Sequence, residues 1–137
     1  DCDKNLALYR AYYEAAKNGW ILSAHDVSEG GLAVTLAEMG FSGKGGLNIN
    51  LDTLPSDGAL TKTAMLFAEN SGRFVIEVAP EHAEAVRAHF ADFAYGEIGS
   101  STGEHENLTI EWGKEILVDE SLSDLKALWK NGLVPYY

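Results

Sequence analysis

The sequence predicts an α+β domain in which helices pack against a mixed β-sheet. Two observations support this class. Segments with the two-residue alternation of strands are interspersed with segments whose apolar residues recur at helical spacing. Some neighbouring strands are separated by a helix, as in a crossover connection, whereas the last two are separated only by a short glycine turn. The 137 residues are enough for a substantial core, and we interpret residues 1–137 as a single domain.

The first segments have the patterns of a helix, a strand and a second helix. Apolar residues at spacings of three and four predict an amphipathic first helix. These residues are Leu6, Tyr9, Tyr13 and Ala16. Asn18-Gly19 ends this helix, because glycine readily adopts the left-handed conformation of a helix terminus. An apolar strand is expected over 20–24 and a helix of small residues over 31–39.

The middle of the chain continues with strands and helices. A glycine-rich hinge and an alternating strand over 47–51 come first, and a short helix is expected over 60–67. A strand over 73–78 is followed by a helix that Pro80 opens and by a strand over 95–98. If these last two strands are parallel, the connection between them is a right-handed crossover.

The C-terminal segments have the patterns of a polar loop, a hairpin and a final helix, over 99–106, 108–118 and 121–131. Ser121 with Asp124 resembles a capping box at the start of the last helix. The expected buried stripe of this helix is Leu122, Leu125 and Trp129.

Composition excludes several classes of function. The net charge of −11, with acidic residues outnumbering basic ones 21 to 10, opposes extended contact with nucleic acid or an anionic membrane surface. Cys2 is the only cysteine, so an internal disulfide or a cysteine metal site is not possible. No apolar run approaches the roughly 20 residues that a membrane span needs. We therefore expect a globular protein of the reducing cytoplasm.

The most informative segment is Ala24-His25-Asp26-Val27-Ser28-Glu29-Gly30-Gly31-Leu32, here called the glycine turn. A strand that ends in polar residues and paired glycines before a helix leaves backbone N–H groups in front of the positive end of the helix dipole. An anion such as phosphate would bind there. The carboxylates of Asp26 and Glu29 could hold Mg²⁺ through water or position a hydroxyl group. Alternatively, Asp26 or Ser28 caps the helix.

The histidines of the chain are open to a functional and a structural interpretation. His25 could hydrogen-bond a phosphate or act as a general acid, or it could be a satisfied structural residue. His82 and His89 are two helical turns apart, too far for a shared metal ion, and solvent exposure is expected for both. No metal site is predicted.

A second polar segment, Leu66-Phe67-Ala68-Glu69-Asn70-Ser71-Gly72-Arg73, lies between a short helix and a strand and is here called the polar hinge. Glu69, Asn70 and Ser71 offer donors and acceptors for an amide, a ribose or metal-bound water. Arg73 can bind a carboxylate or phosphate through two parallel hydrogen bonds. The alternative is a structural turn in which Arg73 pairs with Glu69.

Together, the glycine turn with Ala33, the segment Leu36-Ala37-Glu38-Met39 and the polar hinge with Phe74 resemble the C-terminal domain of the aminoimidazole ribonucleotide synthetase superfamily. Within it, the form of the motifs is most similar to the phosphoribosylformylglycinamidine synthase family, and specifically to the second C-terminal domain of its synthetase chain. The resemblance covers essentially the whole chain. It implies a three-layer α/β/α domain that is partly ferredoxin-like, and a C-terminal fragment of a longer multidomain synthetase.

The resemblance also implies a ligase reaction in purine biosynthesis. ATP phosphorylates the amide oxygen of formylglycinamide ribonucleotide, and ammonia from a glutaminase domain or subunit displaces the phosphate. ATP or ADP and Mg²⁺ would serve the full enzyme, largely through companion domains of the same chain. The isolated domain would be inactive and would hold no cofactor tightly.

The site residues implied by the resemblance fall into two groups. A phosphate- or nucleotide-facing surface would be bordered by His25, Asp26, Ser28, Gly30 and Gly31. Its rim would be formed by Glu69, Asn70, Ser71 and Arg73. No residue is assigned a catalytic role. Two alternatives stay open: a docking module with no ligand of its own, and the equivalent domain of another ATP-dependent member such as selenophosphate synthetase.

Overall fold

A computed structural model describes residues 2–43, 45–103 and 106–132. In chain order the helices and strands are α1 (Cys2–Lys17), β1 (Ile21–Asp26), α2 (Gly31–Ser42), β2 (Gly46–Asn50), the 3₁₀ turn η1 (Leu51–Thr53), α3 (Lys62–Phe67), β3 (Phe74–Val78), the 3₁₀ turn η2 (Pro80–His82), α4 (Ala83–His89), β4 (Gly99–Thr102), β5 (Asn107–Trp112), β6 (Glu115–Ser121) and α5 (Leu122–Asn131). None of the described helices is long and apolar enough to cross a membrane.

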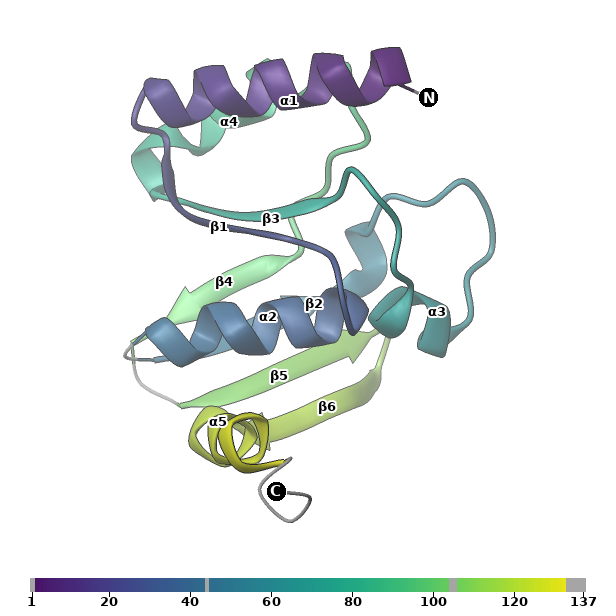
Figure 1. Cartoon of the computed structure of the whole chain (residues 1–137), viewed down its shortest axis with the longest axis vertical. Coiled ribbons are helices and arrows are strands. Elements are labelled where there is room, and N and C mark those ends of the chain that lie inside the picture. Colours follow the sequence, from purple (N-terminus) through teal and green to yellow (C-terminus); the bar gives the residue numbers. More distant parts are fainter. Residues whose placement is uncertain (1, 44, 104–105, 133–137) are drawn as a thin grey trace.

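The described strands form two sheets. β1 and β3 pair antiparallel, and the second sheet has the order β4-β2-β5-β6. That sheet is mixed, because β2 and β5 run parallel while β4 and β6 are antiparallel to their neighbours. In Figure 1, α1 and α4 lie on one side of the β1–β3 pair, and α2 lies across the four-stranded sheet. The α+β class with helices on a mixed sheet is confirmed, and the described strands are divided between two sheets.

The predicted strand over 95–98 and its crossover are wrong. The chain is irregular there, and β4 begins at Gly99, within the segment predicted as a polar loop. β4 pairs antiparallel with β2, whereas β3 pairs antiparallel with β1. The Asn50 amide donates to the Ile98 carbonyl at 2.6 Å, so the chain has already reached the four-stranded sheet before β4 starts. The open edge of β2 supplies the backbone partners that this polar segment needs.

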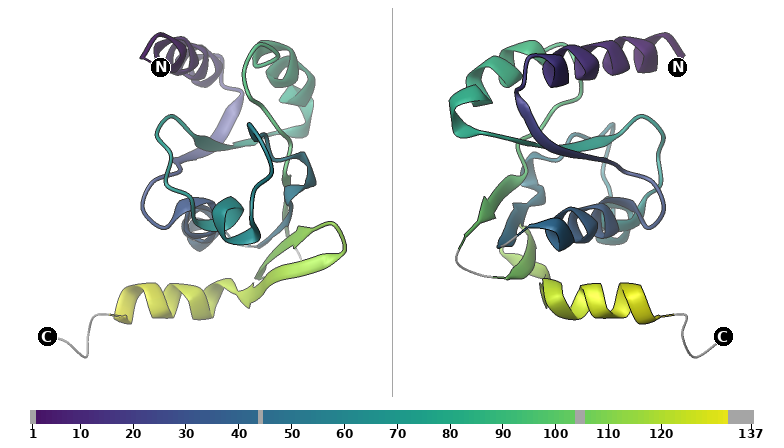
Figure 2. Two further views of the ribbon diagram at one scale, coloured as in Figure 1. Left: turned by 90° about the vertical axis from the view of Figure 1, so that its right-hand side faces the viewer. Right: turned by 60° about the vertical axis from the view of Figure 1, so that its left-hand side comes forward.

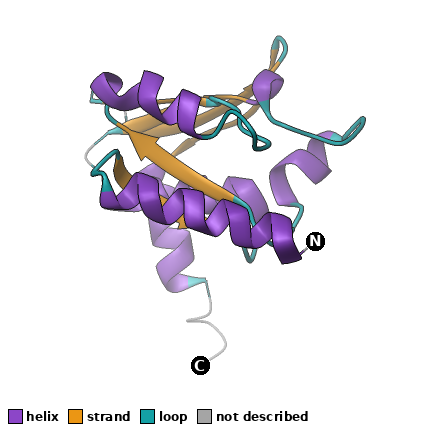
Figure 3. Ribbon diagram, turned by 90° about the horizontal axis from the view of Figure 1, so that it is seen from above, coloured by secondary structure: helices purple, strands orange, loops and turns teal. Residues whose placement is uncertain are grey.

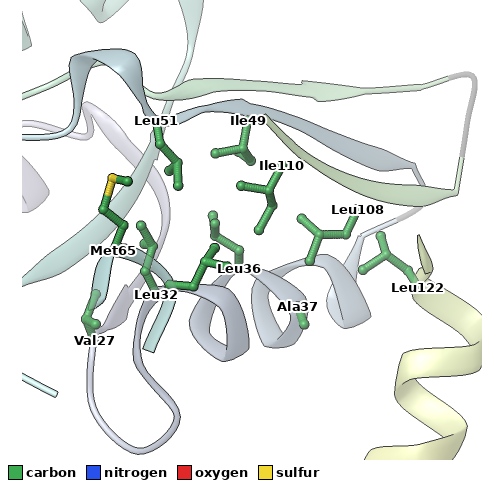
Figure 4. Close-up of a cluster of buried hydrophobic side chains, with 11 residues drawn as sticks. Val27, Leu32, Leu36, Ala37, Ile49, Leu51, Met65, Leu108, Ile110 and Leu122 are labelled. Carbon is green, nitrogen blue, oxygen red and sulfur yellow. The ribbon is translucent and has the colours of Figure 1, made fainter. Parts of the chain in front are cut away.

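Two hydrophobic cores hold these layers together. The larger lies between α2, α3 and α5 on one side and β2 and β5 on the other, as Figure 4 shows. Its buried residues are Val27, Leu32, Leu36, Ala37, Ile49, Leu51, Met65, Leu66, Leu108, Ile110 and Leu122. The smaller core, centred on Ala15, Val86 and Phe90, lies between the β1–β3 pair and helices α1 and α4. Figure 3 shows these two helices over the small sheet from above.

α1 packs mainly through residues other than those that predicted it. Leu6, Tyr9 and Tyr13 are 47%, 44% and 61% exposed. The packed face is instead formed by Leu8, Ala11, Tyr12 and Ala15, of which Leu8, Ala11 and Ala15 belong to the smaller core and Tyr12 stacks on Phe74. Both sets have helical spacing, so periodicity alone does not choose between them.

Two side-chain predictions near the ends of helices are also corrected. Trp129, expected in the buried stripe of α5, is 61% exposed; its ring contacts Phe41 with centroids 5.9 Å apart, and its indole N–H donates to Glu38 at 3.0 Å. His89, expected in solvent, is half-buried: its Nε2 lies 2.9 Å from the Ala11 carbonyl, and its ring meets Trp20 edge-on. The predicted cap of α5 is confirmed, since the Ser121 hydroxyl accepts from the Asp124 amide. Figure 2 shows α5 at the margin of the molecule, where one of its faces stays open.

Candidate functional site

The glycine turn and the polar hinge meet in one open cleft of about 760 Å³. The antiparallel pairing of β1 with β3 explains this, because it places the end of β1 beside the start of β3, with Asp26 opposite Phe74. The Val27 amide donates to the Arg73 carbonyl at 2.9 Å and continues the pairing by one step. The cleft is lined by residues 24–29 and 69–74, together with Tyr9 and Tyr12 of α1.

The N-terminus of α2 is not capped as predicted. Gly30 is the N-cap residue, in the left-handed conformation with φ of 79°, and no side chain of Asp26 or Ser28 caps the helix. The Gly30 amide instead donates to Oε1 of Glu69, at 2.8 Å. A carboxylate from the polar hinge therefore occupies the anion position that the sequence assigned to phosphate.

Gly31 packs directly against the chain at the end of α3. It has a φ of +68°, and a Cβ added there would lie 2.6 Å and 2.7 Å from the carbonyl carbon and Cα of Phe67. Only a residue without a side chain fits this backbone-to-backbone contact. The contact joins the two motifs a second time, through residues that do not line the cleft themselves.

His25 contributes to the cleft lining, but both of its ring nitrogens are engaged with the protein. Nδ1 lies 2.7 Å from the Asp26 carbonyl oxygen, and Nε2 lies 3.1 Å from Oε2 of Glu38 on α2. These contacts match the structural interpretation of His25.

The carboxylates of the glycine turn are exposed at the cleft. The side chain of Asp26 is 65% exposed, and Ser28 and Glu29 are exposed beside it. Within the part of the chain that the structure describes, no group of three or more His, Cys, Asp and Glu side chains is arranged to hold a metal ion. Asp26 and Glu29 would therefore need further ligands, from water or a bound phosphate, to hold Mg²⁺.

Arg73 is the cationic group of the cleft. The alternative of a structural pair with Glu69 is not what the structure has: Arg73 Nη1 donates to the Ala68 carbonyl at 3.1 Å, and Glu69 accepts from Gly30. Burial lowers the pKa of the half-buried Arg73 guanidinium. Asn70 and Ser71 are exposed on the same side of the cleft.

Sequence reasoning missed the aromatic side of the cleft. Tyr12 stacks on Phe74 with ring centroids 5.0 Å apart, and Tyr9 meets the same ring edge-on at 5.8 Å. In the sequence, Tyr9 belongs only to the apolar pattern of the first helix, and Tyr12 falls outside that pattern. No local signal marks either one, because α1 reaches the cleft only through its packing on the small sheet.

Comparison with known proteins gives a consistent family. The family model described as AIR synthase related protein, C-terminal domain, matches residues 1–111. Phosphoribosylformylglycinamidine synthase subunit PurL of Thermoplasma volcanium is 40% identical over 117 residues, which cover 85% of this chain and 15% of the relative. The Synechocystis PurL is 35% identical over 139 residues, covering 97% of this chain and 17% of the relative. The chain thus spans about one sixth of the length of these curated relatives.

Solved structures share the fold at low sequence identity. PurLQS from Thermotoga maritima superposes with a TM-score of 0.80 at 18% identity, over 89% of this chain and 21% of that chain. The hydrogenase maturation protein HypE in complex with ATP gives a TM-score of 0.61 at 20% identity, over 74% of this chain and 36% of that chain. The family match spans most of the chain and includes both motifs of the cleft. The chain belongs to the AIR synthase related protein, C-terminal domain family.

Proposed function

We propose that this chain is the C-terminal domain of a phosphoribosylformylglycinamidine synthase, and that its cleft forms one wall of a nucleotide or phosphate pocket. The parent enzyme would convert formylglycinamide ribonucleotide to the amidine with ATP and glutamine, in the cytoplasm. The observation that carries the proposal is the meeting of the glycine turn and the polar hinge in one cleft. Relatives that match the chain over both motifs are PurL subunits.

The charges of the cleft favour a particular kind of ligand. Its lining carries three carboxylates, Asp26, Glu29 and Glu69, against the single guanidinium of Arg73. An uncompensated phosphate would be repelled by this excess of negative charge. A phosphate that arrives with Mg²⁺, or the hydroxyl groups of a ribose, suits the same carboxylates. Thermotoga maritima PurL has been solved with ATP and with ADP, which supports a nucleotide as the ligand.

The chemistry of the proposed reaction needs more than this domain. An amide oxygen leaves only after phosphoryl transfer, and that step depends on positioning and on charge stabilisation. The described cleft is open on one side and offers one guanidinium, so companion domains of the same polypeptide would supply the remaining contacts. A glutaminase partner would supply ammonia, and the solved PurLQS assembly of Thermotoga maritima supports a partner of this kind.

The test uses the full-length protein that contains this chain, supplied with formylglycinamide ribonucleotide, ATP and glutamine. Arg73→Met and Asp26→Asn should each raise the KM for ATP or ribonucleotide by about tenfold or more, because each removes a charge-assisted hydrogen bond. Arg10→Met and Asp92→Asn are matched controls at exposed positions that do not line the cleft. The controls should keep wild-type kinetics.

The same assay separates the alternatives. If the cleft variants lower only the thermal stability and leave both KM values at the wild-type level, the chain is a docking module and the proposal is wrong. ATP consumption that needs neither glutamine nor ammonia would indicate another reaction of the superfamily, such as selenophosphate synthesis.

A further inference from the structure

His25 lines the cleft, and its ring also extends inwards from β1. Its Nδ1 lies 3.7 Å from Oδ1 of Asp26, the next residue of the strand. On its own face, His25 pairs with Val75, which packs against the larger core, and its Nε2 reaches Glu38 of α2. The ring therefore lies between the small sheet and the helix that follows the glycine turn.

The ring holds the peptide unit where the chain leaves β1. The Asp26 carbonyl is contacted by His25 Nδ1 at 2.7 Å and by the hydroxyl of Thr35, a residue only 1% exposed, at 3.3 Å. The N–H of the same peptide, that of Val27, donates to the Arg73 carbonyl at 2.9 Å. Both polar atoms of this peptide are thus fixed, and its orientation determines where the Asp26 and Ser28 side chains stand.

Glu38 holds the ring in turn. One carboxylate oxygen lies 3.1 Å from His25 Nε2, and the other accepts from the Trp129 indole at 3.0 Å. Both partners of the His25 ring are acceptors, so the imidazolium form donates to both and a neutral ring to one. If the ring rotated away, the Asp26 carbonyl and Glu38 would each lose their contact with it.

We propose that His25 is a positioning residue, which fixes the Asp26–Val27 peptide at the wall of the cleft and is itself anchored by Glu38. It acts on the ligand through the placement of Asp26 and Ser28. The role for ligand binding rests on the proposed function, whereas the role in holding the peptide does not.

The test separates the two ring contacts in the full-length protein. Asparagine places its amide nitrogen about where Nδ1 stands and can still donate to the Asp26 carbonyl, whereas glutamine reaches towards Glu38 instead. The variants are therefore His25→Asn, His25→Gln and His25→Ala. Two readouts are taken: amide hydrogen exchange of the peptide spanning 24–31, and the KM and kcat for ATP.

His25→Asn should keep slow exchange and a KM within about threefold of the wild type, because the hydrogen bond to the carbonyl survives. In His25→Gln and His25→Ala, the amide hydrogens of the peptide spanning 24–31 should exchange faster than in the wild type. The KM for ATP should rise by about three- to tenfold in both variants, with little change in kcat. Equal behaviour of the asparagine and glutamine variants in hydrogen exchange would overturn the positioning role. If exchange separates them while KM is unchanged in all three variants and in Asp26→Asn, the positioning role stands and the proposed function fails.

Discussion

Replacing Gly31 with alanine should destabilise the fold more than the same change at any open glycine. Gly31 combines a φ of +68° with a backbone neighbour, since its Cβ would stand 2.6 Å from the Phe67 carbonyl carbon and 2.9 Å from the Leu66 carbonyl oxygen. Backbone atoms at the end of α3 cannot rotate aside as a flexible side chain could. Either the glycine turn or the polar hinge would have to shift.

Gly19 is the matched control. It has a φ of +73°, and a Cβ there would meet nothing within 4 Å. Alanine in the left-handed region costs about 1 kcal/mol, which applies to both positions. Crowding of a packed region adds about 1–3 kcal/mol at Gly31 alone. We expect Gly31→Ala to lose about 2–4 kcal/mol of unfolding free energy and Gly19→Ala about 1 kcal/mol.

The assay is urea denaturation of the 137-residue chain, followed by far-ultraviolet circular dichroism. An additional loss of about 2 kcal/mol would lower the denaturation midpoint by about 1 M relative to Gly19→Ala. Equal midpoints for the two variants would refute the close approach of the glycine turn to α3. A different slope of the transition in one variant would show that its native or denatured state has changed, so that the two midpoints no longer compare the same unfolding reaction.

Three further outcomes are expected. Ile110→Ala should cost about 2–5 kcal/mol of unfolding free energy, because Ile110 is fully buried in the larger core; a loss below 1 kcal/mol in the same urea assay would contradict its place there. Ser121→Ala should cost about 0.5–1 kcal/mol of unfolding free energy, since it removes the side-chain cap at the start of α5. Ser121→Thr should keep most of that free energy, because a threonine hydroxyl can accept the same hydrogen bond. The hydrogen bond from Arg87 holds the pKa of Glu97 below its ordinary value, so this pair stabilises the fold above the ordinary carboxyl range and is lost as pH falls through the lowered pKa. The melting temperature of Glu97→Gln should therefore fall less between neutral pH and about pH 3 than that of the wild type. An equal fall in both proteins would show that the Arg87–Glu97 pair does not stabilise the fold.

Elements with a strong local pattern were predicted well. The alternation over 47–51 corresponds to β2 (Gly46–Asn50), and the turn at Gly113-Lys114 lies between β5 and β6. β4 was missed because its sequence, Gly-Ser-Ser-Thr, has no apolar alternation and owes its conformation to the open edge of β2. A short polar strand of this kind is determined by its partner rather than by its own residues.

The candidate site shows the same division. Both motifs were recognised, because polar residues and glycines between apolar segments are unusual enough to be noticed. The bond between Glu69 and the Gly30 amide joins residues 39 apart in the sequence, and spacing alone could not have predicted it. The same is true of Arg73, whose partner is the Ala68 carbonyl and not the Glu69 carboxylate that local reasoning suggested.

By itself, the sequence determined the class of fold, the two motifs and the family to which they belong, because these depend on local periodicity and on residue identity. Only the tertiary structure decided that the motifs share one cleft, that Tyr9 and Tyr12 form its aromatic side, and that a carboxylate of the chain itself binds the start of α2. The physical reason is that antiparallel pairing of β1 with β3 brings distant segments together. Which groups form hydrogen bonds then depends on their distance in space, and local patterns along the chain do not predict that distance.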